Sequence, residues 1–175
     1  MNATQTAPFA RPNPVRRRIG LGRWLLPTYV TIAFVLLLIR LAFASSLADT
    51  LGAVKQPPAV LGFFASFFGG VVEELLVRWG WLSIALLALR KLRLGESGAF
   101  WGANVFSALV FGALHLPYAF ALTGVLTPPM IAFVLLANGV AALAFGVLFR
   151  RYGLESAMIA HAVTDVWLHG VFAAV

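Results

Sequence analysis

Long apolar runs separated by prolines or basic residues divide most of this chain. About 20 consecutive apolar residues are enough for a helix to cross the hydrocarbon core of a membrane. The pattern therefore predicts about five transmembrane helices, over residues 24–46, 58–89, 99–119, 130–149 and 154–175. The second run is longer than one crossing needs, and we expect a bend or a close helix approach at its Gly69-Gly70 pair.

The composition supports a membrane location. Hydrophobic residues make up 61% of the chain and charged residues 11%, whereas charged residues are about a quarter of a soluble domain. The fold class predicted is an all-α integral membrane protein, a compact bundle of about five transmembrane helices with an internal polar cavity. Residues 1–23, which are rich in proline and arginine, are predicted to be a basic cytoplasmic tail, and residues 24–175 a single transmembrane domain.

The net charge of +7 reflects the position of the basic residues more than an affinity for nucleic acid. The arginines and lysines cluster before the first apolar run, after the second and after the fourth. These are alternate loops, so the positive-inside rule predicts a cytoplasmic N-terminus and an outward C-terminus. Together with the short chain, this pattern favours a protein of the prokaryotic inner membrane that contacts the lipid bilayer and no nucleic acid.

A cleaved signal peptide is the alternative interpretation of the first apolar run. Ala42-Phe43-Ala44 resembles a small-residue cleavage site that follows a basic and then an apolar segment. Arg40 interrupts the end of the apolar run, however, and the preceding basic region is long. A retained anchor helix is therefore favoured, with the Arg40 side chain reaching the membrane interface.

Ionisable residues within the second run are the first candidates for function. Side chains of this kind are costly at membrane depth unless they face protein or a water-filled cavity. Glu74 and Arg78 are four residues apart and can pair along a helix. Adjacent helical residues point about 100° apart, so Glu73 is left to face a cavity, where it could act as a general base. The alternative is that all three charges form a structural network that fixes helix register.

The third and fifth runs each carry a histidine with a partner one helical turn away. Phe111 precedes His115 by four residues, and Asp165 follows His161 by four. A lone histidine on an apolar helix is more often a packing residue than a catalyst. His169 extends the His161 stripe by another turn, but the spacing matches no standard zinc site. Since the chain has no cysteine, thiol chemistry is excluded and any catalysis must use carboxylate, imidazole or hydroxyl groups.

Taken together, these positions resemble the signature motifs of the CPBP family of intramembrane proteases, also called Abi or CAAX-protease-like proteins. The motifs occur in the family's order as Glu73-Glu74-x-x-x-Arg78, Phe111-x-x-x-His115 and His161-x-x-x-Asp165. The resemblance extends over about Leu61 to Val175, and any one motif would be weak alone. It implies that residues 24–175 form a transmembrane protease domain.

In this family a glutamate and a histidine activate water, and residues of the last motif stabilise the oxyanion. By residue match, the catalytic residues are Glu73, His115, His161 and Asp165, and the supporting residues are Glu74, Arg78 and Phe111. Val77 and Trp79 depart from the family's usual Phe and Gly, which changes packing. Asp165 stands where Asn is common, and an ionised Asp cannot donate a hydrogen bond to an oxyanion. If position 165 must donate to the oxyanion, Asp165 would have to be protonated; otherwise its role shifts to orienting His161.

The resemblance predicts an intramembrane endopeptidase that hydrolyses a membrane-anchored protein or peptide tail. No cofactor is predicted; a divalent metal such as zinc has suitable ligand types here, but a metal-free water activated by glutamate is favoured because no standard zinc motif is present. Two alternatives stay open. The same charges could serve a small proton- or ion-coupled transporter, or the chain could be a non-catalytic bacteriocin-immunity protein of the same fold.

Overall fold

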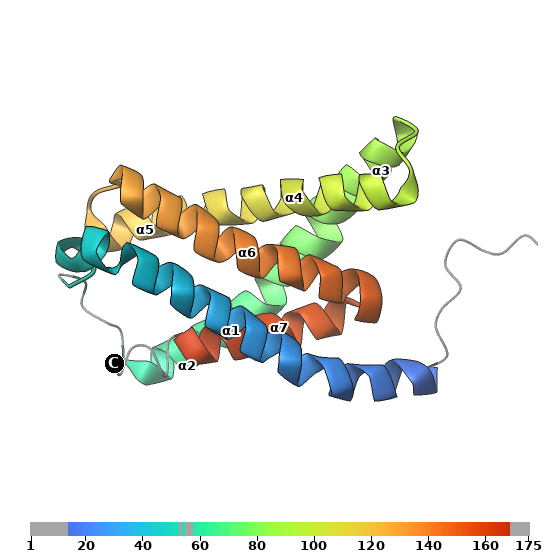
Figure 1. Ribbon diagram of the computed structural model, residues 1–175, viewed down its shortest axis with the longest axis horizontal. Helices are drawn as coiled ribbons and strands as arrows, with labels where there is room; N and C mark the ends of the chain where they lie inside the picture. The colour runs from blue at the N-terminus through green and yellow to red at the C-terminus, as the bar shows by residue number, and fades with distance from the viewer. Residues whose placement is uncertain (1–13, 53, 55–57, 169–175) are drawn as a thin grey trace, which may run out of the picture.

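A computed structural model describes residues 14–52, 54 and 58–168, and within these ranges the chain forms helices and short connections with no strand (Figure 1). Two of the elements are π-helical and interrupt one long helix, in which they follow α2 without a break. The elements in chain order are α1 (Pro14–Gly52), α2 (Ala59–Phe68), η1 (Gly69–Glu73), η2 (Leu75–Leu82), α3 (Ser83–Lys91), α4 (Glu96–Leu114), α5 (Leu116–Thr123), α6 (Pro128–Tyr152) and α7 (Leu154–Val166).

Four helical segments of the described chain are long and apolar enough to cross a membrane: Pro27–Thr50, Val60–Lys91, Glu96–Thr123 and Pro128–Tyr152. The predicted all-helical membrane bundle is therefore confirmed. The fifth predicted segment forms α7, whose 13 helical residues pack back against the bundle, while residues 169–175 lie outside the described part. Helix α1 begins at Pro14, within the predicted tail, because proline is well tolerated in the first turn of a helix.

At the Gly69-Gly70 pair the long second helix changes from α-helical to π-helical geometry and packs closely against α7. The π-helical stretch η1 begins at Gly69, and such stretches are frequent at functional sites. A Cβ atom on Gly70 would lie 2.7 Å from the Ala162 Cβ and 3.0 Å from the Met158 carbonyl oxygen. No side chain fits between these backbones. The predicted close approach is therefore confirmed, and it brings α7 against the helix that carries the glutamates.

Helices α4 and α6 lie along one another through small and polar residues. Ala142 is fully buried, and a Cβ atom on Gly146 would overlap the Asn104 side chain of α4. Asn104 donates a hydrogen bond from Nδ2 to the Leu143 carbonyl oxygen at 3.1 Å. An interhelical hydrogen bond of this kind fixes the register of two apolar helices. This contact fixes the register of α4 relative to α6, and therefore the position of His115 at the end of α4.

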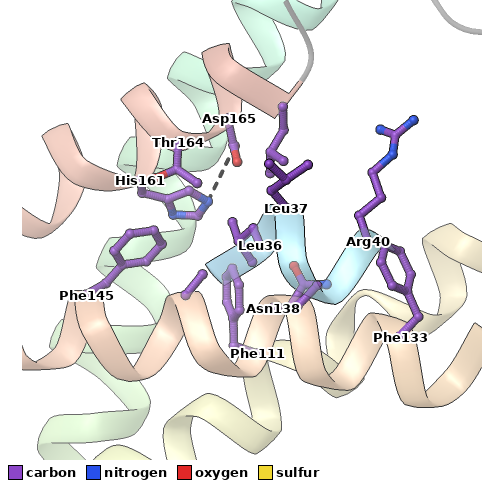
Figure 2. Close-up of a pocket in the computed structure, with 13 residues that line it drawn as sticks. Leu36, Leu37, Arg40, Phe111, Phe133, Asn138, Phe145, His161, Thr164 and Asp165 are labelled. Carbon is purple, nitrogen blue, oxygen red and sulfur yellow. Dashed lines mark ion pairs between the residues drawn. The ribbon is translucent and has the colours of Figure 1, made fainter. Parts of the chain in front are cut away.

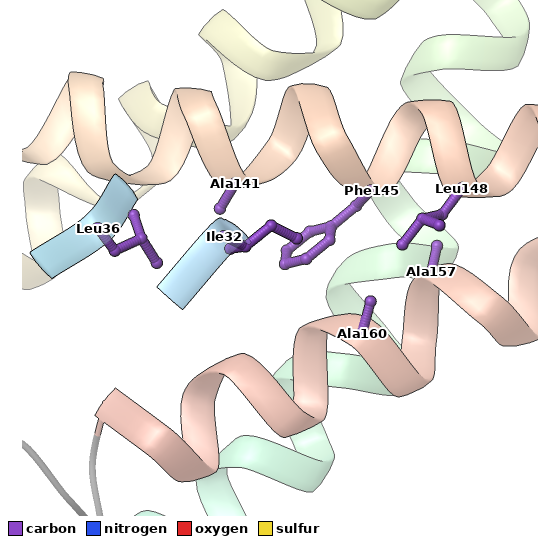
Figure 3. Packing of buried hydrophobic residues seen from close by; sticks show 7 residues of the cluster. All are labelled: Ile32, Leu36, Ala141, Phe145, Leu148, Ala157 and Ala160. Atoms are coloured by element: carbon purple, nitrogen blue, oxygen red, sulfur yellow. The ribbon is translucent and has the colours of Figure 1, made fainter. Parts of the chain in front are cut away.

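A buried apolar cluster joins α1, α6 and α7 (Figure 3). Phe145 of α6 is its largest side chain, and the alanines of α7 allow the helices to approach closely. Its members are Ile32, Leu36, Ala141, Phe145, Leu148, Ala157 and Ala160. The cluster places α7 so that the ring of Phe145 also meets a residue of the candidate site, His161.

Candidate active site

Glu74 and Arg78 form a buried ion pair in the π-helical part of the long helix. Both side chains are completely buried, and Nε of Arg78 lies 3.1 Å from Oε2 of Glu74. The predicted pairing four residues apart is confirmed. The other glutamate oxygen, Oε1, accepts a hydrogen bond from Nδ1 of His161 at 3.1 Å. Both oxygens of Glu74 are thus engaged, one by its own helix and one by α7.

The guanidinium of Arg78 also has two aromatic neighbours, Phe111 and Phe145. Its central carbon lies 5.7 Å from the centre of the Phe111 ring and 6.0 Å from that of Phe145. A cation over an aromatic face is attracted by the ring quadrupole, more strongly when water is excluded. Within the described residues, none of the three guanidinium nitrogens makes a hydrogen bond, so the contact with Glu74 is an ion pair only. Arg78 is therefore held by one ion pair and two aromatic rings, which indicates a structural role for its charge.

Glu73 points away from this pair and toward two histidines. Its side chain is 35% exposed, in contrast to the buried Glu74. Oε2 of Glu73 lies 3.8 Å from Nε2 of His115 and 3.8 Å from Nε2 of His161. These distances exceed a direct hydrogen bond. The carboxylate of Glu73 therefore stands between two imidazoles contributed by two other helices.

His115 occupies the junction between α4 and α5, where the helix is interrupted. Its Nδ1 is 2.8 Å from the Phe111 carbonyl oxygen, and because a carbonyl only accepts, Nδ1 carries the proton in that contact. Nε2 is consequently the nitrogen directed at Glu73. The ring centres of Phe111 and His115 are 4.5 Å apart, so Phe111 covers one side of this imidazole, as the spacing in the sequence predicts.

His161 is more buried than His115, with a side chain only 5% exposed. The Phe145 ring stacks on it at 5.0 Å, and the Phe111 ring meets it edge-on at 5.5 Å. Its Nε2 lies 3.4 Å from Oδ2 of Asp165, one turn further along α7 (Figure 2). Since Nδ1 is used by Glu74, the imidazole is held at both nitrogens, and its orientation is set by these two carboxylates.

A largely apolar cavity of about 920 Å³ borders this cluster. Glu73, His115 and Asp165 line it, and most of the remaining wall is aliphatic and aromatic. A second cavity of about 230 Å³ lies on the α1 side and is lined by His161 and Asp165, as Figure 2 shows. Asp165 belongs to both walls. The structure thus brings side chains from the three predicted motifs, Glu73, His115 and Asp165, together in the wall of one cavity.

Two further residues of these walls have no site role in the sequence analysis. Asn138 lines both cavities and donates from Nδ2 to the Val134 carbonyl at 2.9 Å, whereas its spacing in the sequence suggests only helix packing. Arg40 lines the smaller cavity, near Asn138 and Phe133 in Figure 2. A polar residue within an apolar helix was the available signal for both. Nothing in the sequence shows which way either side chain points.

Within the described residues, no group of three or more His, Cys, Asp or Glu side chains is arranged to hold a metal ion. Carboxylate and imidazole are nevertheless suitable metal ligands in general. His169, which extends the α7 stripe in the sequence, lies outside the described part of the chain.

The fold and the site define an all-helical integral membrane protein with carboxylates and imidazoles gathered beside a largely apolar cavity. Residues 55–167 match the family described as Type II CAAX prenyl endopeptidase Rce1-like. The chain belongs to this family, and the resemblance stated from the three motifs is confirmed. Helix α1 precedes the matched region. No curated protein and no solved structure matches the chain.

Proposed function

We propose that this protein is an intramembrane endopeptidase that cleaves a membrane-anchored protein or peptide tail, with Glu73 as general base. The observation that carries the proposal is the position of Oε2 of Glu73, 3.8 Å from Nε2 of both His115 and His161 beside a largely apolar cavity. Family membership supports proteolysis as the reaction class. We also propose the prokaryotic inner membrane as the location, with the N-terminus in the cytoplasm.

The spacing suits a water molecule held between Glu73 and His115. Two polar atoms 3.8 Å apart are too distant for a direct hydrogen bond, and a contact of that length is commonly bridged by water. Glu73 is partly exposed to the cavity while Glu74 is sealed by Arg78 and His161. Of the two glutamates, only Glu73 can therefore meet both water and substrate.

In the proposed reaction Glu73 takes a proton from this water as the water oxygen bonds to the peptide carbonyl carbon. The resulting tetrahedral intermediate carries its negative charge on the former carbonyl oxygen. Its carbon–nitrogen bond then breaks, and the proton held by Glu73 passes to the leaving nitrogen. The products are a carboxylic acid and an amine. A positioned acid/base group of this kind contributes about 10²- to 10⁴-fold to the rate.

We assign oxyanion stabilisation to the Nε2–H of His161, which would be shared between Asp165 and the oxyanion, and we assign the orientation of the His161 imidazole to Asp165. Nε2 is the nitrogen of His161 that is not bound to Glu74, and it lies 3.4 Å from Asp165. A carboxylate can accept from this nitrogen but cannot donate to an oxyanion. The distance therefore favours the orienting role for Asp165. His115, fixed through Nδ1 by the Phe111 carbonyl, would position the water.

The test is a cleavage assay on purified, detergent-solubilised protein with a library of membrane-anchored peptides, in which mass spectrometry identifies new termini. We expect cleavage at defined peptide bonds and its loss in Glu73→Gln. Reconstituted vesicles that move protons or ions without cleaving any peptide would favour the transporter instead. A protein that confers bacteriocin immunity equally well with Glu73→Gln, and cleaves nothing, would be the non-catalytic alternative.

A further inference from the structure

Most of the basic residues that the structure describes lie at one end of the bundle. Nη2 of Arg150, at the end of α6, lies 3.8 Å from Oε1 of Glu96, at the start of α4. Glu96 follows the α3–α4 connection, which contains Arg90, Lys91 and Arg93. Figure 1 shows the beginning of α1 at this same end. The described parts of the three basic clusters therefore lie at the same end of the bundle.

The large cavity takes its walls from the opposite end of the bundle. Val54 follows α1, Phe64 lies in the first turns of the second span, and Leu122 lies near the end of the third. Met130 lies in the first turn of α6. The second and third spans and α6 thus contribute to the cavity mainly from the halves that are distant from the basic clusters, and α1 contributes only through Val54, which follows it.

The reactive groups are also nearer to that opposite end. At 1.5 Å per residue, Glu73 lies about 20 Å of helix from Val60 and about 27 Å from Lys91. His115 lies about 12 Å from Thr123 and about 28 Å from Glu96 on the same scale. A cavity of about 220 Å³ is found near the basic end, but it is lined by Thr28, Ala144, Val147, Leu148, Arg151 and Tyr152 and reaches none of the site residues.

We propose that the catalytic cavity opens toward the extracytoplasmic side of the membrane and receives the apolar tail of a substrate from that side. The basic end faces the cytoplasm by the positive-inside rule, so the cavity mouth faces away from it. The cavity wall on this side is apolar and aromatic, with Phe64, Tyr118 and Leu122 among its residues, which suits an apolar peptide segment and not a charged one. The inference rests on the proposed endopeptidase function for its substrate, but not for its sidedness.

The absence of cysteine from the chain allows sidedness to be measured without reference to activity. A single Leu122→Cys places a thiol at the cavity mouth, and Ser97→Cys, on the exposed first turn of α4, is the matched control at the basic end. A membrane-impermeant maleimide is applied to spheroplasts and to inverted membrane vesicles. We expect labelling of Leu122→Cys only in spheroplasts and of Ser97→Cys only in inverted vesicles. The reverse pattern, or labelling of Leu122→Cys only after detergent is added, would overturn the proposal.

A cleavage experiment tests the substrate half of the proposal. The probe is a quenched fluorescent peptide with a charged, impermeant N-terminal half and a C-terminal half of leucine, alanine and phenylalanine. We expect sealed right-side-out vesicles to cleave it at least tenfold faster than inverted vesicles, and detergent to abolish the difference. Faster cleavage by inverted vesicles, or equal rates in sealed vesicles of both kinds, would show that the substrate can enter from the cytoplasmic side and would overturn the proposal. If detergent-solubilised protein does not cleave the probe or the peptide library, the proposed function fails, while the labelling result still decides the sidedness.

Discussion

Glu74 accepts a hydrogen bond from His161 across 87 positions of the chain, with 3.1 Å between Oε1 and Nδ1. This bond links the first and third sequence motifs directly. Glu74 is also paired with Arg78 through its other oxygen, so its carboxylate is fully occupied within the protein. The consequence is a division of roles between adjacent glutamates, in which Glu74 holds the site together and Glu73 is left to face the cavity.

Removal of one partner of the buried pair is expected to destabilise the protein. Arg78→Ala leaves the carboxylate of Glu74 buried without its cation, and Glu74→Gln leaves the guanidinium without its anion. A buried charge stranded in this way costs about 3 kcal/mol or more. Thermal unfolding of the detergent-solubilised variants, together with their yield, would measure the loss.

Two control variants test whether the loss of stability comes from leaving one buried charge without its partner. Lys91→Ala removes an exposed cation from the same long helix, and we expect a change within about 0.5 kcal/mol. The double change Glu74→Leu with Arg78→Met removes both buried charges at once and is expected to recover part of the stability, though His161 then loses its partner. Equal stability of Arg78→Ala and the parent protein would contradict the structural role of the pair.

Gly70→Ala is expected to disrupt the contact between η1 and α7. The added methyl group would lie 2.7 Å from the Ala162 Cβ and 3.0 Å from backbone atoms, so α7 must shift. Overpacking of this kind costs about 1–3 kcal/mol, and the shift would move His161 and Asp165 away from Glu73. Activity is therefore expected to fall together with thermal stability.

Gly139→Ala is the control for this change, because an added methyl group there meets nothing within 4 Å. It lies inside α6, where alanine is a better helix former than glycine. We expect parental stability or a small gain. Should Gly70→Ala behave like Gly139→Ala in both stability and activity, the close packing of η1 on α7 is not needed for the site.

The sequence was sufficient to predict the helical membrane bundle and several local contacts. Hydropathy identifies the spans because a helix must satisfy its backbone groups internally in lipid. The Glu74–Arg78 pair and the cover of His115 by Phe111 follow from helical spacing alone. Gly70 was predicted as a point of close approach because a residue without a side chain lets helices meet.

Long-range geometry could not be obtained in this way. The bond between Glu74 and His161 depends on how α7 packs, which the periodicity of neither segment specifies. The π-helical winding around Glu73 depends on tertiary contacts, and the sequence contains no distinct signal for it. Asn138 fits a packing stripe equally well whether or not it also faces a cavity. Residue spacing predicts neighbours one turn apart, but not which helices meet.

Asp165→Asn tests the orienting role proposed for Asp165. An asparagine still offers an oxygen that can accept from Nε2 of His161, so we expect activity within about tenfold of the parent. Asp165→Ala removes the acceptor, and the loss of one hydrogen bond to a charged partner is expected to lower activity by about tenfold or more. Initial rates at several pH values would be compared for both variants. If Asp165→Asn is as impaired as Asp165→Ala, the carboxylate itself is required and the role assigned here is wrong.

The proposed mechanism uses water activated by glutamate without a metal, so chelators are expected to leave the rate unchanged. Purified protein would be dialysed against EDTA or 1,10-phenanthroline and assayed with and without added zinc. Thermal unfolding with and without chelator gives a second readout that does not depend on activity. Reversible loss of cleavage on chelation, with recovery on addition of zinc, would replace this mechanism with a metal-dependent one.

The most direct test of the central claim is the cleavage rate of Glu73→Gln in detergent. Glutamine keeps the size of the side chain but cannot take a proton from water, so turnover is expected to fall by at least about 10²- to 10⁴-fold, with thermal stability unchanged. Glu96→Gln, an exposed glutamate at the start of α4, serves as the control and is expected to keep the parental rate. A folded Glu73→Gln variant that cleaves the peptide library as fast as the parent would contradict the assignment of Glu73 as general base.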